Sequence, residues 1–411
     1  MPSSVRATGT GAAVDWADSG LVALTGHHDG PPLVPPGRAA TRARELGTAL
    51  AEATGGRVRL DGARLLSERA GFTGHTRRGR VSAGGSCRLL RTADGWAAVS
   101  CARPDDPSLL GALVGAELPA DPWPAVGAWL AAHTGAELAG RATLLGIAAA
   151  PVRHRTAAPP VGGAPARDVT GRLVVDFSAL WAGPLCAHLL GLAGARVVKV
   201  ETPWRPDGAR LGDPGFYRLL HAGHRSVVLD PGTPAGRRAL AALVDAADVV
   251  IEASRPRALA RWGLDAAASA STGTTWISIT AAGRGSDRVG FGDDVAAAAG
   301  LVARDAANQP VFCGDALADP LTGLTAAVLA LTTPAGSLLD IAMADTVAAT
   351  LDPGPAGKAL AARRRGDQWT LDTPSGRVAV RPPRRRAAQG AAPPSGADTD
   401  EVLRGLGIPR P

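Results

Sequence analysis

Aromatic residues are scarce in this sequence of 411 residues, at 4% of the total. Proteins that bind nucleic acids by base stacking combine aromatic side chains with clustered basic ones. Here 44 basic residues exceed 37 acidic ones, for a net charge of +7, but the arginines are spread along the chain. We therefore expect no nucleic-acid partner. We interpret the small positive excess as favouring anionic small molecules.

Cysteine is also rare, and its pattern excludes the common metal sites. None of the four cysteines forms a Cys-x-x-Cys pair, and no His/Cys cluster has the spacing of zinc ligands, so we expect no bound metal. They are Cys87, Cys101, Cys186 and Cys313. The first residues show no signal-peptide pattern, and no apolar run approaches the ~18 residues of a membrane span. These absences predict a reduced, cytoplasmic protein without membrane contact.

The length predicts about two to three domains, and 45% hydrophobic residues are enough to fill their cores. Two stretches rich in proline, glycine and alanine interrupt the pattern, at 151–168 and 381–400. We interpret both as connectors. Within the second, Arg384, Arg385 and Arg386 are interpreted as a solvated basic stretch.

An α/β pattern lies between the two connectors. A strand with the apolar core Leu-Val-Val-Asp-Phe (171–180) precedes a segment with leucines at helical spacing. Segment 233–247 begins with Thr-Pro and continues as an amphipathic helix. Further strands are expected at 195–201, 225–230, 248–253 and 274–281. Alternating strands and helices predict an open, parallel, Rossmann-like sheet with helices on both faces, whose ligands bind beyond the carboxyl ends of the strands.

The sequence also contains an internal repeat. The segment Asp-Ser-Gly-Leu-Val-Ala-Leu at 18–24, followed by Val-Arg-Leu-Asp-Gly at 58–62, resembles Ala-Ala-Gly-Leu-Val-Ala-Arg at 298–304, followed by Ser-Leu-Leu-Asp-Ile. Gly20 and Asp61 are 41 positions apart, and Gly300 and Asp340 are 40 apart. The matched order and spacing favour a partial duplication, which covers 15–66 near the N-terminus.

Several motifs in fixed order resemble the family III CoA-transferases, which include the formyl-CoA and carnitine CoA-transferases and the α-methylacyl-CoA racemases. They include Val-Val-Asp-Phe-Ser-Ala-Leu-Trp-Ala-Gly-Pro-Leu (174–185), Gly-His-Arg-Ser-Val-Val-Leu-Asp (223–230) and Gly-Asp-Ala-Leu-Ala-Asp-Pro-Leu-Thr-Gly-Leu (314–324). The resemblance covers roughly residues 170–350 and the C-terminal tail. It implies a CoA-binding α/β catalytic domain over 171–350.

The order of the parts differs from the usual layout of that family, in which a smaller α+β domain follows the catalytic half. Here segments at 82–115 and 137–152 resemble that smaller domain and come first. We therefore expect the smaller domain over 1–150, a linker over 151–170, and a connector and tail over 351–411. A fused pair of genes that lost its outer halves would leave this order, and the smaller domain should pack against the α/β domain.

The resemblance places the nucleophile at Asp319, with Asp315 as its nearby rival. Ala318 stands where the family has a glycine before this aspartate. An apolar run follows Asp319, so we expect it near a helix N-terminus, where a carboxylate is kept ionised. In this reading, Asp319 forms a mixed anhydride with the acyl group and then a thioester with CoA. The expected activity is acyl-CoA:carboxylate CoA transfer, with CoA as substrate and no cofactor.

The resemblance also indicates residues that would contact CoA. Arginine suits bidentate phosphate contacts, and a glycine-rich loop at 83–86 would cover the site through Gly84 and Gly85. The expected CoA contacts are Ala182, Gly183, Pro184, Arg210, His224, Arg225, Arg261 and Trp262. Trp181 fills a position that can be polar in the family, where it would narrow the acyl pocket.

Two other functions stay open. A racemase needs an acid/base pair, but the segment Gly-Phe-Gly-Asp-Asp (290–294) lacks the histidine that racemases carry there. A non-catalytic CoA-binding duplicate is the second alternative, because the first copy is truncated and Ala318 replaces the family's glycine, although Asp319 is retained. The first repeat has no aspartate near 39–42, so we expect at most one site per chain. As partners, the resemblance implies an acyl-CoA, a carboxylic acid and a second copy in a homodimer, which can be interlocked.

Overall fold

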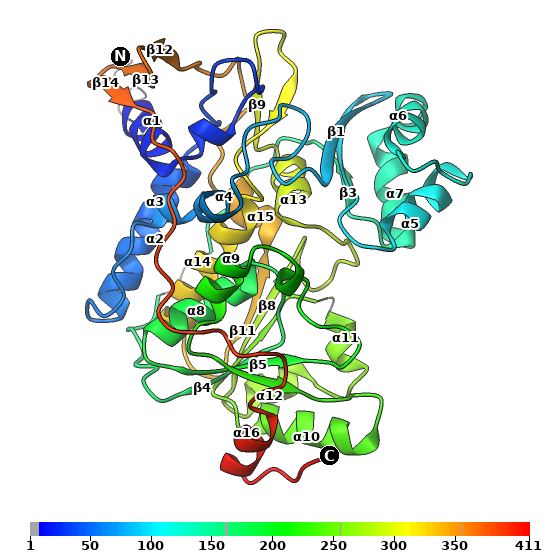
Figure 1. Ribbon diagram of the computed structural model, residues 1–411, viewed down its shortest axis with the longest axis vertical. Helices are drawn as coiled ribbons and strands as arrows, with labels where there is room; N and C mark the ends of the chain where they lie inside the picture. Colours follow the sequence, from blue (N-terminus) through cyan, green and yellow to red (C-terminus); the bar gives the residue numbers. More distant parts are fainter. Residues whose placement is uncertain (1–7, 161–162, 255, 355) are drawn as a thin grey trace.

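A six-stranded parallel sheet forms the centre of the second half of the chain (Figure 1). The computed structural model describes residues 8–160, 163–254, 256–354 and 356–411. The strand order is β11-β8-β7-β4-β5-β6, and every neighbouring pair is parallel. The strands are β4 (Leu173–Asp176), β5 (Arg196–Glu201), β6 (Arg225–Val228), β7 (Val249–Glu252), β8 (Thr275–Thr280) and β11 (Leu338–Ala342). The five strands expected from the sequence are present, and β11 adds a sixth.

Helices cover both faces of this sheet, which confirms the expected fold class. Successive residues of β4 point to opposite sides: Val174 packs into the core that contains α8 and α14, and Val175 into the core that contains α10 and α16. Helix α10 begins after Thr233, whose side chain accepts the Gly236 N–H at 2.9 Å, as expected of a Thr-Pro start. The helices of this half are α8 (Ala182–Leu192), α9 (Pro214–His221), α10 (Pro234–Asp245), α11 (Pro256–Ala260), α12 (Ala266–Ser271), α13 (Gly292–Ala298), α14 (Ala318–Thr332), α15 (Met343–Ala348) and α16 (Thr399–Gly405), with the 3-10 turn η2 (Gly208–Leu211).

The first helices of the chain share the core of the parallel sheet. They are α1 (Thr8–Ser19), α2 (Ala39–Ala53), α3 (Gly62–Leu65) and α4 (Glu68–Thr73), with the 3-10 turn η1 (Val22–Leu24). Leu46 and Leu50 of α2 lie in one hydrophobic cluster with Leu321 and Leu324 of α14. Residues 8–73 therefore pack with the α/β half, which differs from the single smaller unit over 1–150 that we expected.

A separate lobe is built from residues 87–151 (Figure 1, cyan). Three antiparallel strands, β1 (Cys87–Thr92), β2 (Gly95–Ser100) and β3 (Ala149–Pro151), pair in that order and pack against three helices. These helices are α5 (Asp106–Val114), α6 (Trp123–Ala132) and α7 (Gly135–Leu145). The sheet also contacts the α/β half, since Cys87 and Leu89 share a cluster with Ala297 and Phe312. The lobe and the α/β half thus touch within one chain.

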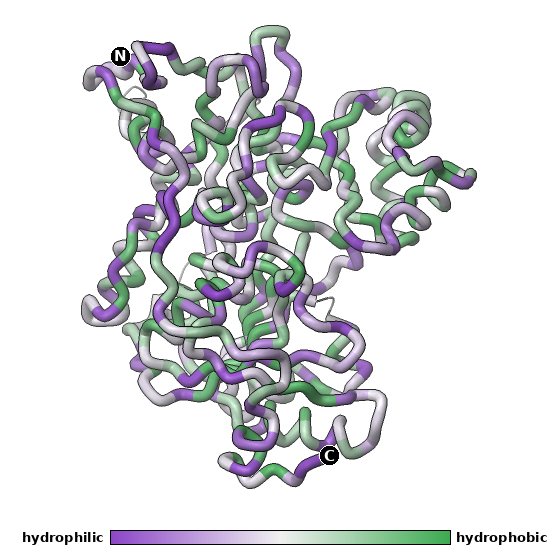
Figure 2. Tube along the Cα trace, viewed as in Figure 1, coloured by the Kyte–Doolittle hydropathy of each residue, from purple (hydrophilic) through white to green (hydrophobic). Residues whose placement is uncertain are grey.

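The segment after α15 is more structured than the connector we expected. It forms a second three-stranded antiparallel sheet, β12 (Arg363–Arg365), β13 (Gln368–Thr373) and β14 (Gly376–Ala379), which packs on α1. The hydropathy of the chain is low there and along the following connector, and high in the central strands (Figure 2). Arg386, expected to be solvated, instead pairs with buried Glu68, its Nε lying 2.7 Å from Oε1.

The two repeat segments fold alike and contact each other. Helices α1, α2 and α3 pack pairwise, as do α13, α14 and α15, and α2 packs along α14. The strands β9 (Val302–Arg304) and β10 (Pro310–Phe312) correspond to η1 and the segment around Leu33. Each copy is also hydrogen-bonded to the segment that follows the other copy: the Phe312 N–H donates to the Gly79 carbonyl at 2.9 Å, and the Val34 N–H to the Leu360 carbonyl at 2.8 Å. The repeat is therefore arranged as an internal pair.

Candidate active site

Asp319 lies in the first turn of α14. Helix α14 precedes parallel strand β11 and runs back along the sheet, so its N-terminus lies at the carboxyl edge of the strands. Ala318 is the first helical residue and does not disturb the start, because the left-handed residues of this turn are Gly314 and Ala316. The side chain of Asp319 is partly buried and accepts no hydrogen bond from the residues the structure describes. Its carboxylate is thus unengaged by the described residues.

Three more carboxylates surround Asp319. Asp315 is fully buried in the preceding turn. Asp293 in α13 accepts the Ala316 N–H at 2.8 Å and so holds that turn in place. Asp294 accepts a hydrogen bond from the Ser100 hydroxyl of the lobe at 3.0 Å. The site therefore joins α13, the turn before α14 and strand β2.

The side chains that pair with Asp315 come from the N-terminal segment. Arg69 of α4 forms a bidentate pair with Asp315, and its Nε lies 2.9 Å from Oδ2. The His75 ring nitrogen Nδ1 lies 3.2 Å from the same oxygen. The Arg69 guanidinium carbon is also 5.1 Å from the ring centre of Trp181, which is buried before α8. Residues 69–75 thereby close one side of the carboxylate cluster.

Burial and charge set the proton affinity of this cluster. Burial raises the pKa of Asp319 to about 7; Arg69 lowers it, and the carboxylates of Asp293, Asp294 and Asp315 raise it further. Burial also raises the pKa of Asp293 and of Asp294 to about 6. Burial opposes ionisation of Asp315 as well, but Arg69 and His75 hold its pKa well below the usual range. The expectation that the helix N-terminus keeps Asp319 ionised is therefore wrong near and below neutral pH, because burial outweighs the helix.

Two glycines fit closely around the cluster. A Cβ on Gly292, at the start of α13, would overlap Asp319 Oδ2, so only glycine leaves room for that oxygen. Gly84, in the loop expected to cover the site, lies beside the clamp around Asp315. A Cβ there would be 3.4 Å from the His75 ring and 3.9 Å from Asp315 Oδ1. Gly85 follows it with φ of +87° and lies against Arg78. The structure therefore brings the loop and the aspartates together.

The other residues expected at the site are spread over the carboxyl edge of the sheet. Ala182, Gly183 and Pro184 form the first turn of α8 and are buried. Arg261 follows α11 and is exposed, with no ion pair among the described residues. Trp262 is half-buried against the core around α10. Of these groups, Arg261 offers an unengaged charge.

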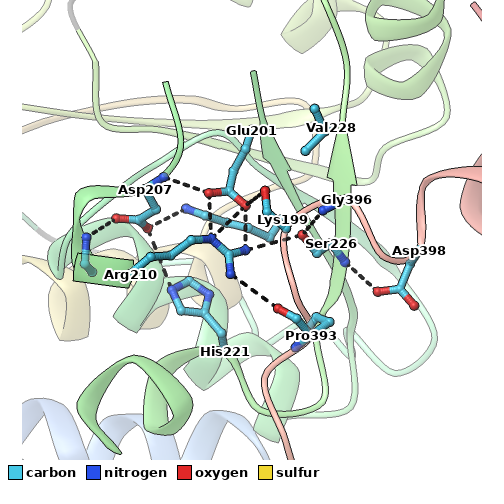
Figure 3. A network of polar contacts seen from close by, with 12 residues as sticks. Lys199, Glu201, Asp207, Arg210, His221, Ser226, Val228, Pro393, Gly396 and Asp398 are labelled. Atoms are coloured by element: carbon cyan, nitrogen blue, oxygen red, sulfur yellow. Dashed lines mark hydrogen bonds and ion pairs between the residues drawn. The ribbon is translucent and has the colours of Figure 1, made fainter. Parts of the chain in front are cut away.

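Arg210 belongs to a buried polar network (Figure 3). Its guanidinium pairs with Glu201 at the end of β5, with Nη2 2.6 Å from Oε2, and lies over the Tyr217 ring. In the same network the Lys199 amine lies 3.0 Å from Asp207 and 3.7 Å from Asp176. Burial would lower the pKa of Lys199, but these two carboxylates raise it. Arg210 is thus committed to Glu201 rather than free for a phosphate.

His224 and Arg225 also differ from the expectation. His224 is buried, and both its ring nitrogens lack partners among the described residues. Burial, with Lys199 nearby, lowers its pKa to about 3, so it is neutral at neutral pH. Arg225 is exposed but pairs with Asp398 at 2.8 Å and Glu401 at 2.9 Å in the C-terminal segment. Neither presents a free positive charge to an anion in this structure.

Arg69 and His75 were missed by the sequence analysis. Arg69 and Asp315 are 246 residues apart, and no local pattern links them. The available signal was the repeat, because both residues follow directly after its first copy, at 15–66. If the two copies pair, the residues that follow the first copy are candidates for contacts with the second.

The described residues contain neither a metal-binding cluster nor a membrane-spanning helix. No group of His, Cys, Asp or Glu able to hold a metal ion occurs in the part of the chain that the structure describes. The four cysteines are all unpaired. None of the described helices combines the length and apolarity needed to cross a bilayer.

Comparisons with known proteins place this geometry in context. The family model described as CoA-transferase family III matches residues 169–375. A succinate–glutarate CoA-transferase of Agrobacterium fabrum is 30% identical over 210 residues, which cover 44% of this chain and 52% of that protein. A formyl-CoA:oxalate CoA-transferase of Afipia carboxidovorans is 34% identical over 105 residues, covering 24% and 25%. The chain thus spans at most about half the length of these relatives.

A solved structure of a CaiB/BaiF family protein from Brucella suis is similar to part of the chain. It is 24% identical, with a TM-score of 0.43, and the match covers 52% of this chain and 65% of the other.

Proposed function

The chain belongs to CoA-transferase family III, and from this membership we propose that it transfers CoA from an acyl-CoA to a carboxylic acid, with Asp319 as nucleophile. The observation that carries the proposal is the position of Asp319. It lies in the first turn of α14 at the carboxyl edge of the sheet, with a carboxylate that accepts no hydrogen bond from the described residues. A nucleophile of this kind must be held in place but left unengaged.

The proposed reaction proceeds by two covalent species. An Asp319 oxygen attacks the thioester carbonyl, the C–S bond breaks, and CoA leaves as a thiolate, which gives an acyl-aspartyl anhydride. The thiolate then attacks the aspartyl carbonyl, releasing the donor acid and forming an aspartyl-CoA thioester. The acceptor carboxylate attacks this thioester, and the same two steps in reverse give the new acyl-CoA and free Asp319.

Both intermediates hydrolyse if water reaches them, so the site needs a cover. The loop of Gly84 and Gly85 is suited to this role, since it already lies beside Asp315, Arg69 and His75. Backbone N–H groups at such glycines would stabilise the oxyanion of each addition step.

We further propose that CoA binds beyond the first turn of α8, formed by Ala182, Gly183 and Pro184, and towards Arg261 and Trp262. The exposed Arg261 supports this placement for the phosphates, and the half-buried Trp262 offers a face for the adenine. Arg210, His224 and Arg225 would contribute only if ligand binding released their present partners. CoA is a substrate here, and no cofactor is expected.

The test is chemical trapping of the intermediates. Purified protein is incubated with a panel of acyl-CoA donors and then treated with hydroxylamine or borohydride, and its peptides are identified by mass spectrometry. We expect modification of the peptide containing Asp319 in the unaltered protein and in Asp345→Asn, a matched change at an exposed carboxylate. No modification is expected in Asp319→Asn.

The alternatives predict other outcomes. CoA binding without any adduct would favour a non-catalytic duplicate, the alternative that the truncated first copy and Ala318 keep open. Exchange of the donor's α-proton with deuterium, without transfer, would favour a racemase-like enzyme, although the residue packed against Asp319 is Gly292 and no histidine stands in 290–294. A homodimer and a cytoplasmic location stay predictions.

A further inference from the structure

Arg69 and Asp315 form a clamp at the edge of the carboxylate cluster. Two nitrogens of Arg69 donate to the two oxygens of Asp315, and the carboxylate is completely buried. A bidentate pair of this kind fixes the position of both groups more strictly than a single ion pair. Asp315 precedes Asp319 by four residues, around the turn that begins α14.

The clamp is itself held from two sides. The Arg69 guanidinium packs over the face of buried Trp181, and a Cβ added at Gly84 would lie 3.8 Å from its Nη2. His75 adds a second contact to Asp315 at 3.2 Å. Arg69 therefore has little freedom to leave the cluster and neutralise another group.

Arg69 is the cation that acts on Asp319. The carboxylates of Asp293 and Asp294 in α13 and of Asp315 in the preceding turn raise the pKa of Asp319, and Arg69 of α4 lowers it. His75, in the loop after α4, faces Asp315. The charge on Asp319 thus depends on the balance between one guanidinium and three acids.

We propose that Arg69, through its pair with Asp315, is a positioning residue that holds the turn before Asp319 and sets the charge on the Asp319 carboxylate. This rests on the proposed function, in which Asp319 is the nucleophile. Arg69 lies in the segment that follows the first repeat, and Asp319 lies in the second repeat. The first half of the chain therefore completes the site around Asp319.

The proposal predicts opposite effects for the two halves of the clamp. Removing the positive charge of Arg69 leaves Asp315 as an anion without its partner, which raises the pKa of Asp319. Removing the negative charge leaves Arg69 facing the remaining carboxylates and makes Asp319 easier to ionise. A purely structural role predicts losses that do not depend on pH in this way.

The experiment compares Arg69→Gln, Asp315→Asn, the double variant and Arg69→Lys by the pH profile of kcat/KM. The acid limb should move up by about one pH unit in R69Q and down by a similar amount in D315N. At pH 6, R69Q should be about tenfold less active than the unaltered protein and recover above pH 8. The double variant should return the acid limb to near its original position. R69K keeps the positive charge, so its acid limb should stay close to that of the unaltered protein. An unmoved acid limb in both folded single variants would overturn the proposal.

A second readout separates this inference from the proposed activity. With Cγ-labelled aspartate, the Asp319 carboxyl can be titrated by ¹³C NMR without substrate and assigned by its loss in Asp319→Asn. The same opposite shifts are expected there. If trapping failed but these shifts appeared, the transferase assignment would fall and the clamp would stand. If R69Q does not fold, D315N and the double variant still decide the question, because both remove the buried negative charge.

Discussion

At the scale of single residues, Asp319 is subject to two opposed influences. The N-terminus of α14 favours its ionised form, whereas burial among Asp293, Asp294 and Asp315 favours the protonated one. Its pKa of about 7 shows that burial dominates. A group with a folded-state pKa above its unfolded value binds extra protons in the folded state, so its ionisation destabilises the fold as the pH rises.

Replacing Asp319 with asparagine should therefore stabilise the protein above neutral pH. The free energy of unfolding contributed by Asp319 falls as the pH rises from about 4 to about 7, and the amide cannot ionise. We expect Asp319→Asn to raise the free energy of unfolding by about 1 to 2 kcal/mol more at pH 8 than at pH 5, as measured by urea unfolding.

Asp345→Asn serves as the control, because Asp345 is exposed and lies in a surface pair with Arg155. It should change stability by a similar, small amount at both pH values. An equal gain for Asp319→Asn at pH 5 and pH 8 would contradict the assignment of its raised pKa.

The family resemblance predicted Asp319 and the Gly84 loop at one site, and in the structure both lie near Asp315. It did not reveal which arginines were already engaged. The partner of Arg225 is 173 residues away at Asp398, and Arg210 is held by Glu201 in a network that closes only in three dimensions. A basic side chain next to a glycine-rich turn looks the same in sequence whether its charge is free or paired.

At the scale of elements, the buried amine of Lys199 ties the strands to the loops beyond them (Figure 3). It extends from β5 to Asp176 at the end of β4 and to Asp207 in the following loop. Asp207 in turn accepts the N–H of Leu180 at 2.9 Å, a non-glycine residue held at φ of +70° directly before α8. The network thus fixes the turn that leads into the proposed CoA-binding helix.

Lys199→Met should be strongly destabilising. It keeps the side-chain volume but leaves two buried carboxylates without their cation, a change that costs about 3–5 kcal/mol. Urea unfolding followed by circular dichroism measures the loss.

Arg172→Ala provides the contrast, since it removes a pair with Asp248 whose arginine is 61% exposed. That change should cost less than about 1 kcal/mol. A comparably small loss for Lys199→Met would mean that water or rearrangement already compensates the buried acids.

The strands β4 to β8 and helix α10 were predictable because apolar runs and a Thr-Pro start mark them. Strand β11 was not predicted, because it is an edge strand with Leu338 37% exposed and no continuous apolar run. Strand β12 consists of three exposed arginines and is defined only by its pairing with β13. Strands that form because a neighbouring strand pairs with them cannot be recognised from their own sequence pattern.

At the scale of the whole molecule, the two repeats form an internal pair. The segment after the first copy, through Gly79, pairs with Phe312 of the second, and the segment after the second copy, through Leu360, pairs with Val34 of the first. The sequence predicted the repeat, but not that its copies face each other. That arrangement depends on contacts across nearly 300 residues, such as α2 on α14.

This pairing bears on the oligomeric state. The family resemblance implies a homodimer, so we expect a mass of about twice 41.4 kDa in solution, from two chains that each contain this internal pair. Light scattering coupled to size-exclusion chromatography gives the mass directly. A mass of 41.4 kDa at low micromolar concentration would contradict the homodimer.

Because the Lys199 amine is buried, it is not accessible to reagents that couple proteins to a surface or a dye. The sequence contains two lysines, Lys199 and Lys358, and Lys358 is exposed. Lys358 lines a surface pocket together with Pro36, Gly37 and Arg304, which contains no residue of the Asp319 cluster. Among the lysine side chains, amine-directed coupling will therefore act only at Lys358. Molecules attached through Lys358 will all present the same face.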